Sequence, residues 1–267
     1  MIGDQLHIVI CVKQTSSASN VAAGAAPGAS RAAMNPFDEY ALEEGVRIKE
    51  RANGKAVVSV LSLGPQDAVG TLRETIARGA DAVYLLSSPD FDGSDAYATS
   101  YALSKAVEKL SKEKGPVDLV LFGKQTNDSD TGQVGPGVAA WLNWPNVAFV
   151  KKLEIGSGKA IASRLMEDGT DVLDLALPAC VSVVKEINEP RLPSLKGKMA
   201  AKKAEIPVWG PAELAADTSK AGAQGSRLAV SAPSAPPMRS GGVKVEGATA
   251  QEKAKNLLAK LREMKLV

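Results

Sequence analysis

The chain has 267 residues, of which 45% are hydrophobic, enough for one substantial core and a smaller extension. Lysine and arginine number 32 and aspartate and glutamate 30, so the net charge of +2 does not indicate binding to nucleic acid. There is no apolar run of about 18 residues and no basic-then-apolar amino terminus, so we expect a cytoplasmic protein without a membrane span.

The first 150 residues alternate between strand and helix patterns. Apolar, largely β-branched runs predict parallel strands that are covered on both faces, at residues 7–13, 56–61, 82–86, 118–122 and 147–150. Apolar residues at helical spacing, with caps or glycine stops, predict helices at residues 36–53, 66–78, 95–114 and 132–142. This alternation is typical of the α/β class and predicts a doubly wound parallel sheet.

The pattern changes after residue 150. Residues 160–166 and 172–177 flank a turn of the composition Glu-Asp-Gly-Thr, which predicts an added β-hairpin, and residues 181–185 form one more strand. Prolines from residue 188 onward are expected to break up any long element. Both cysteines, Cys11 and Cys180, lie in apolar runs and are expected to be buried rather than paired or metal-bound.

The C-terminal part has a different composition. Residues 212–248 are rich in Ala, Gly, Ser and Pro and predict an extended arm that lies on a partner. Residues 250–264 carry Leu257, Leu258 and Leu261 on one stripe, which predicts an amphipathic helix that needs a surface. We therefore expect an α/β domain over residues 1–211 and a C-terminal arm and helix over residues 212–267.

The loop at residues 123–136, GKQTNDSDTGQVGP, joins a predicted buried strand to a predicted helix. Backbone N–H groups and a helix dipole at such a junction can hold an anion, and ligands of open α/β sheets collect at the carboxyl ends of the strands. The loop has neither a Walker ending nor a GxGxxG pattern. On pattern alone, a nucleotide site and a plain structural turn are both open.

Several motifs resemble the β subunit of electron-transfer flavoproteins. They are MNPFDEYALEE (34–44), LFGKQ (121–125), residues 162–182, NEPR (188–191), GKM (197–199), KKAEI (202–206), GVKV (242–245) and LLAKL (257–261). One segment departs, because residues 14–33 are rich in Ala, Ser and Gly where family members usually carry a charged hairpin. The resemblance implies a Rossmann-like, adenine-nucleotide-binding fold and a heterodimer in which the α subunit supplies most of the site for an electron-transferring FAD.

The resemblance also implies which residues bind the nucleotide. They would be Cys11, Asn35, Pro36, Phe37, Asp38, Leu63, Gly123, Lys124, Gln125, Thr126, Asp130, Thr131, Gly132, Gln133 and Val134. Asn35 has an alternative interpretation as a plain helix cap. No catalytic acid or base and no metal site is expected, because a bound flavin carries the redox chemistry itself. The only histidine, His7, opens a strand far from its carboxyl end and is expected to be structural.

Two subtypes of the family differ in the ligand of this site, which is either AMP as a structural filler or a second FAD that accepts hydride from NADH. The stretch GSDAYATS (93–100) resembles the GxDxxATS motif of the electron-bifurcating and nitrogen-fixation-linked subunits, and residues 130–136 resemble their DTxQVGP motif. Both motifs imply FAD and add Asp95, Thr99 and Ser100 to the site. Gly137 departs, since many bifurcating relatives have Glu there. Alternatively, Asp95 only caps a helix that contains Thr99 and Ser100.

Residues 190–199, PRLPSLKGKM, resemble the recognition loop, at about residues 188–200, by which the family docks on acyl-CoA dehydrogenases. Leu195 aligns with its apolar anchor; without the resemblance, the lysines would indicate a solvated surface. The expected function is an electron-bifurcating β subunit that oxidises NADH and passes electrons to the α-subunit FAD and to ferredoxin or flavodoxin. The alternatives are an AMP-containing electron shuttle for acyl-CoA dehydrogenases and a nucleotide-binding stress or regulatory protein of the same fold.

Overall fold

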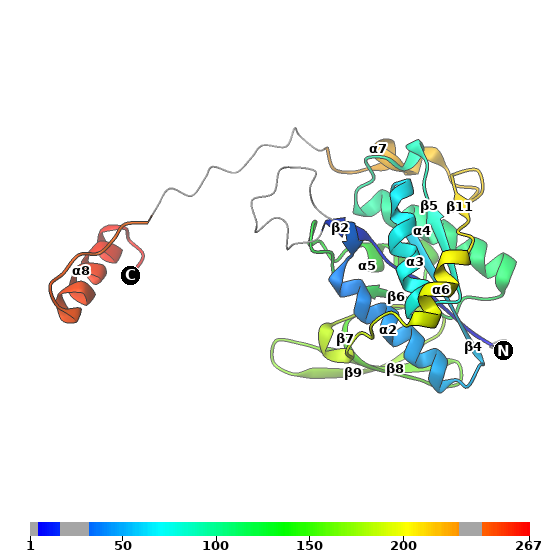
Figure 1. Ribbon diagram of the computed structural model, residues 1–267, viewed down its shortest axis with the longest axis horizontal. Helices are drawn as coiled ribbons and strands as arrows, with labels where there is room; N and C mark the ends of the chain where they lie inside the picture. Colours follow the sequence, from blue (N-terminus) through cyan, green and yellow to red (C-terminus); the bar gives the residue numbers. More distant parts are fainter. Residues whose placement is uncertain (1–4, 17–31, 230–241) are drawn as a thin grey trace. The chain divides into compact units, whose positions relative to one another are not determined.

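The computed structural model describes residues 5–16, 32–229 and 242–267 (Figure 1). The chain divides into two compact units, Met1–Ala229 and Val230–Val267. Most of the segment at residues 14–33, whose composition departs from the family, lies outside the described residues. Its two ends form an antiparallel pair of short strands, β2 (Gln14–Ser16) and β3 (Ala32–Met34).

The first unit is built on a nine-stranded sheet with the order β11-β5-β4-β1-β6-β10-β7-β8-β9. Its parallel strands are β1 (Leu6–Cys11), β4 (Ala56–Leu63), β5 (Ala82–Leu86), β6 (Leu119–Gly123), β7 (Asn146–Ile155), β10 (Ala179–Val183) and β11 (Val208–Trp209). The chain moves outward from β1 to one side and then crosses to β6 on the other. The predicted doubly wound parallel sheet is confirmed.

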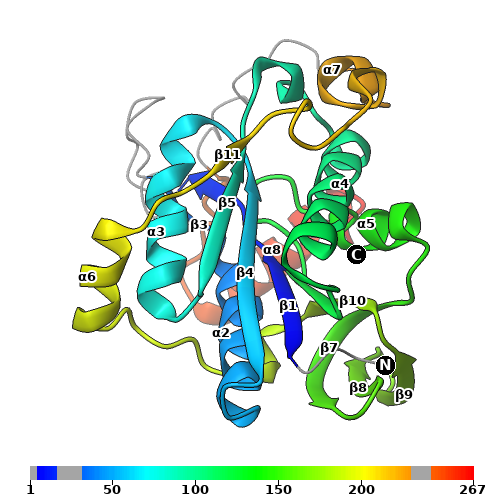
Figure 2. The same cartoon turned by 90° about the vertical axis from the view of Figure 1, so that its right-hand side faces the viewer.

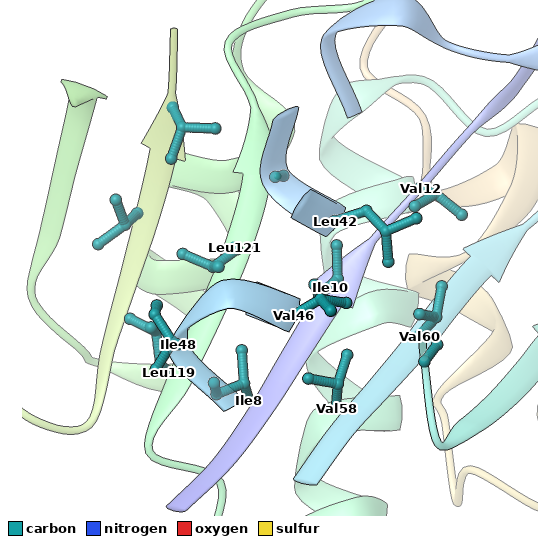
Figure 3. Close-up of a cluster of buried hydrophobic side chains, with 14 of the residues drawn as sticks. Ile8, Ile10, Val12, Leu42, Val46, Ile48, Val58, Val60, Leu119 and Leu121 are labelled. Atoms are coloured by element: carbon teal, nitrogen blue, oxygen red, sulfur yellow. The ribbon is translucent and has the colours of Figure 1, made fainter. Parts of the chain in front are cut away.

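Helices cover both faces of this sheet. On one face lie α2 (Pro36–Arg51) and α3 (Val69–Arg78), and on the other lie α4 (Ala96–Lys114) and α5 (Val134–Leu142). Figure 2 shows α3 and α4 on opposite sides of the central strands. Because side chains alternate along a strand, Ile8 and Ile10 of β1 pack under α2, while Val9 faces α4. Figure 3 shows the first of these layers, with Leu42 of α2 above the strands.

The predicted hairpin is present as β8 (Lys159–Leu165) and β9 (Thr170–Ala176), which extend the main sheet in antiparallel fashion. The strand before it is longer than the predicted residues 147–150. It runs over Asn146–Ile155 because its first part pairs with β10 and its second part pairs with β8.

A nine-residue helix, α6 (Leu195–Lys203), lies where prolines were expected to interrupt regular structure. Ser194 caps it by accepting a hydrogen bond from the Gly197 N–H (2.9 Å), and the flanking prolines lie outside the helix. A Cβ atom on Gly197 would lie 2.2 Å from the Ala77 carbonyl oxygen, so this glycine lets α6 pack directly on α3. The second half of the segment that resembles the recognition loop is therefore helical.

The first unit continues beyond residue 211. Residues 212–229 contain η4 (Thr218–Lys220) and α7 (Gly222–Gly225), and they bury Leu214 and Ala221 against the face that carries α4. Only the part after Ala229 belongs to the second unit, which contains α8 (Ala250–Glu263). The leucines of its stripe are partly or largely exposed, with Leu257 at 47%. No helix among the described residues is long and apolar enough to cross a membrane.

Candidate functional site

The candidate site lies at the carboxyl ends of β1 and β6, and Asn35 is its central connection. This side chain is completely buried, immediately before α2. Its amide nitrogen donates to Asp38 Oδ1 (2.9 Å) and to the Gln125 carbonyl oxygen (2.8 Å), and its Oδ1 accepts from the Asn127 N–H (3.2 Å). Asn35 occupies the cap position of α2 without making a capping hydrogen bond. It therefore fastens the start of α2 to the loop after β6, which a plain cap would not do.

Asp38 supports this connection from the first turn of α2. Its Oδ2 accepts a hydrogen bond from the Lys13 N–H (2.7 Å), just after the end of β1. Burial raises the pKa of Asp38 to about 7, against the opposing effect of hydrogen bonds from the Lys13, Asn35 and Gly123 groups. The carboxyl group thus joins β1, α2 and β6 in a water-excluded position.

Gly123 permits the close approach of β6 to α2. A Cβ atom there would lie 2.5 Å from Asp38 Oδ1 and 2.6 Å from the Phe37 carbonyl carbon, so no other residue fits. The next residue, Lys124, places its ammonium group 5.8 Å from the centre of the Phe37 ring. The first turn of α2 and the start of the loop are therefore in direct contact.

The loop at residues 123–133 is ordered by its own polar groups. The Thr126 and Ser129 hydroxyls lie 2.7 Å apart, the Asp130 N–H donates to the Thr126 carbonyl (2.9 Å), and Gln125 donates to the Asp130 carboxylate. Asp130 and Gly132 adopt positive φ angles of 56° and 61°, a conformation that aspartate and glycine tolerate best.

The loop ends at the start of α5, whose first-turn N–H groups have no partners within the helix. Thr131 and Gln133 are exposed beside this turn, and Gly135 is buried beneath it. The N–H groups of Val134 and Gly135, the helix dipole and the absence of a side chain at Gly132 suit a phosphate group. The residues present therefore fit the phosphate end of a nucleotide at this edge.

Two other predicted site residues are the last residues of neighbouring strands. Cys11 is the last residue of β1 and is 7% exposed, and burial raises the pKa of its thiol well above the usual range, so it acts as an apolar group. Leu63 is the last residue of β4 and is half-buried. Both lie at the carboxyl-end edge of the sheet, where the nucleotide site was predicted.

Asp95, Thr99 and Ser100 lie at the start of α4. Asp95 accepts a hydrogen bond from the Ala98 N–H (2.9 Å), as a helix cap does, and Ser100 is buried with its hydroxyl donating to the Tyr97 carbonyl. Among the described residues, no hydrogen bond joins Asp95 or Thr99 to the loop at residues 123–133. The link between the two motifs is packing: a Cβ atom on Gly137 would lie 2.7 Å from the Ser100 Cβ.

His7 is buried at the opposite end of β1. Its Nε2 lies 2.9 Å from the Ser59 hydroxyl, and burial lowers the pKa of its imidazole. It contacts no candidate site residue, as the structural interpretation requires. The described residues contain no cluster of three potential metal ligands.

Sequence reasoning missed some residues that build the site. Lys13 Nζ forms an ion pair with Asp128 Oδ2 at 2.7 Å, which ties the end of β1 to the loop, and Asn127 contributes its N–H to Asn35. Burial alone would raise the pKa of Asp128, but the charge of Lys13 and hydrogen bonds from Lys13, Thr126 and Ser129 together outweigh it and lower that pKa. The sequence could have indicated these residues as parts of the site, because Lys13 lies just beyond the end of a strand and residues 127–129 lie inside the loop.

The electron transfer flavoprotein domain matches residues 7–214 of this sequence. The chain belongs to the electron transfer flavoprotein family. It is 37% identical to electron transfer flavoprotein subunit beta of Megasphaera elsdenii, over 98% of this chain and 100% of that protein. Identity to subunit CarD of the caffeyl-CoA reductase-Etf complex of Acetobacterium woodii is 36%, with the same coverage. Protein FixA of Bradyrhizobium diazoefficiens is 33% identical over 88% of this chain and 84% of its own length.

These relatives confirm the resemblance to the β subunit and to the bifurcating and nitrogen-fixation-linked type. Membership of the electron transfer flavoprotein family also excludes the stress or regulatory protein that the fold alone would have allowed.

Proposed function

We propose that this β subunit pairs with an electron transfer flavoprotein α subunit and holds FAD at the edge of its sheet, where NADH delivers a hydride. The observation that supports this proposal is the buried Asn35 side chain, which joins the start of α2 to Gln125 and Asn127 and so fixes the loop at the carboxyl end of β6. The GSDAYATS and DTGQVGP motifs favour FAD over AMP. Similarity to subunit CarD of the caffeyl-CoA reductase-Etf complex and to protein FixA supports that choice.

The protein's own contribution is to bind and orient. The N–H groups of the first turn of α5 and the dipole of that helix would hold phosphate oxygens, and Thr131 and Gln133 would add side-chain contacts. The buried Asn35 and Asp38 network fixes the start of the loop. A flavin bound there would supply hydride acceptance and onward transfer of electrons to the α-subunit FAD and to a ferredoxin or flavodoxin.

The α6 surface is the proposed docking site for an acyl-CoA dehydrogenase or a related flavoenzyme. Leu195 and Met199 stand four residues apart on α6 and are 78% and 60% exposed, and Leu192, which precedes the helix, is 86% exposed. Arg191 holds this segment in place through bonds to Glu43 and Glu50 of α2, at distances of 2.5–3.1 Å. A preformed apolar stripe of this kind can enter a pocket at low entropic cost.

The second candidate function is an electron shuttle with AMP at the same site. Gly137 favours it, because many bifurcating relatives carry Glu at this position. Any side chain there would lie 2.7 Å from the Ser100 Cβ, so the packing of α4 on α5 in this chain leaves no space for that glutamate. The shuttle would use the same α6 surface to meet its dehydrogenases.

The two functions differ in their reaction with NADH, which variants of the loop can test. We expect NADH to bleach the flavin of the wild-type pair anaerobically. Thr131→Ala with Gln133→Ala should retain the α-subunit flavin and lose this reaction, and the exposed Gln66→Ala should behave as wild type. Bleaching that survives the double substitution would exclude the loop as the NADH-reduced flavin site.

A further inference from the structure

The segment at residues 211–229, here called the strap, packs across the loop that precedes α4. The Ala223 N–H donates to the Asp92 carbonyl (2.8 Å), and the Gly222 N–H donates to the Ser94 hydroxyl (3.1 Å). Gly222 has a φ angle of 57°, and a Cβ atom on it would lie 2.3 Å from the Asp90 carbonyl oxygen. Figure 2 shows α7 of the strap next to the start of α4. The strap and this loop are therefore in backbone-to-backbone contact.

Asp95 holds the end of the strap. While its Oδ1 caps α4, its Oδ2 accepts hydrogen bonds from the N–H groups of Arg227 (2.7 Å) and Leu228 (3.1 Å). Its own N–H donates to the Ser226 hydroxyl (2.8 Å), which in turn donates to the Gly93 carbonyl (2.8 Å). Burial would raise the pKa of Asp95, but the backbone N–H donors outweigh it and lower that pKa, so the ionised carboxylate is the form that holds the strap.

An aromatic contact adds to this attachment. The Arg227 guanidinium carbon lies 4.9 Å from the centre of the ring of Tyr97, in the first turn of α4. Both carboxylate oxygens of Asp95 are thus already engaged by backbone donors, two of them from the strap. In this structure the Asp95 carboxylate binds backbone N–H groups of the chain itself, although its motif was interpreted as part of a flavin site.

The strap precedes the segment of the chain that contains α8. One residue after Leu228 the first unit ends, and the chain continues to α8, whose Leu257 and Leu258 are 47% and 44% exposed. A helix with such a stripe needs a partner surface to bury it. Fixing the point where the connecting segment begins restricts the positions that α8 can sample, and this lowers the entropy lost on binding.

We propose that Asp95 is a positioning residue that latches the strap to α4 and so sets the point from which the C-terminal segment reaches the α subunit. This inference rests on the proposed pairing with an α subunit, but not on the identity of the nucleotide. The latch raises the affinity of the two subunits without contacting the α subunit itself.

Three variants separate the latch from the other roles of Asp95. Asp95→Ser keeps a side-chain oxygen that can cap α4 but removes the acceptor for the Arg227 and Leu228 N–H groups. Gly222→Ala forces the strap away from the Asp90 carbonyl while Asp95 stays intact. Asp92→Asn is the matched control, because Asp92 is exposed in the same loop and its carboxylate accepts no hydrogen bond among the described residues.

The test measures amide hydrogen exchange by mass spectrometry and subunit affinity in the co-purified pair. We expect peptides that cover residues 226–228 to exchange at least about tenfold faster in the Asp95→Ser and Gly222→Ala variants, with the start of α4 still protected in the former. The α subunit should bind both variants about three- to tenfold more weakly. Asp92→Asn should match the wild type in both measurements.

Two results would overturn the latch: unchanged protection of residues 226–228 in Asp95→Ser, or lost protection with undiminished affinity for the α subunit. Loss of flavin from Asp95→Ser with a fully protected strap would make Asp95 a flavin ligand instead. Cofactor analysis of the wild-type pair is a separate measurement. AMP in place of a second FAD would refute the proposed function and leave the exchange result as it stands.

Discussion

Replacement of Asn35 by Ala removes the connection on which the candidate site depends. The substitution deletes three hydrogen bonds, to Asp38 Oδ1, to the Gln125 carbonyl and from the Asn127 N–H. A net hydrogen bond contributes about 0.5–1.5 kcal/mol, and a buried group left without a partner costs about 1–3 kcal/mol. Because the Asp38 and Gln125 oxygens retain other partners or partial access to water, we expect a total loss of about 2–4 kcal/mol.

For a unit of this size, each kcal/mol lowers the melting temperature by about 2–4 °C, so the variant should melt about 4–16 °C below the wild type. Differential scanning calorimetry of the co-purified pair measures this shift, and extraction measures nucleotide content, which should fall with it. Asn146→Ala is the control, since Asn146 is exposed and its side chain makes no hydrogen bond among the described residues. An Asn35→Ala pair that melts like the control and retains its nucleotide would refute the argument that Asn35 builds the site.

Three further predictions concern other parts of the chain. Burial lowers the pKa of His7, against the opposing effects of a backbone carbonyl and a carboxylate. The unfolded chain therefore binds the proton at a higher pH than the folded chain does, and stability should fall as pH decreases below about 6.5. Urea unfolding at several pH values should show that His7→Gln reduces this fall, and an unchanged slope would contradict it. Leu195→Ala should weaken binding to the partner dehydrogenase about five- to thirtyfold with flavin content unchanged, whereas the exposed Val172→Ala should have no effect; equal binding of both would reassign α6 as a structural connection. The chain expressed without an α subunit should aggregate through α8, and Leu257→Ser with Leu258→Ser should make it monodisperse in size-exclusion chromatography; a wild-type chain that is monodisperse alone would show that the stripe needs no partner.

Local patterns predicted the core of the fold because each element carries its own periodicity. The strand at residues 82–86 was predicted with the bounds that β5 has, and the helix that begins at Pro36 ends at Arg51, two residues from the predicted end. Such strands are buried on both faces, so a continuous apolar run is required at each of them. The α6 helix was missed because Pro193 and Pro207 lie close enough in sequence to indicate a break, yet both fall outside the helix that Ser194 caps.

Contacts between distant segments could not be read from the sequence. Asn35 and Gln125 are separated by 90 residues, so the local pattern indicated a helix cap while the structure uses the side chain to hold a loop. Asp95 shows the reverse case, since its cap was foreseen but its bonds to residues 226–228 were not. The composition of residues 212–229 was interpreted as an extended arm. The same small residues also allow a strap to pack closely where two backbones meet, as at Gly222, so composition alone could not distinguish the two.

The most direct test of the account counts the nucleotides in the purified pair of this chain and its α subunit. The proposed function predicts two FAD per pair, no AMP in the extract and anaerobic bleaching of flavin by NADH. One FAD and one AMP per pair, with no reaction with NADH, would contradict the bifurcating function.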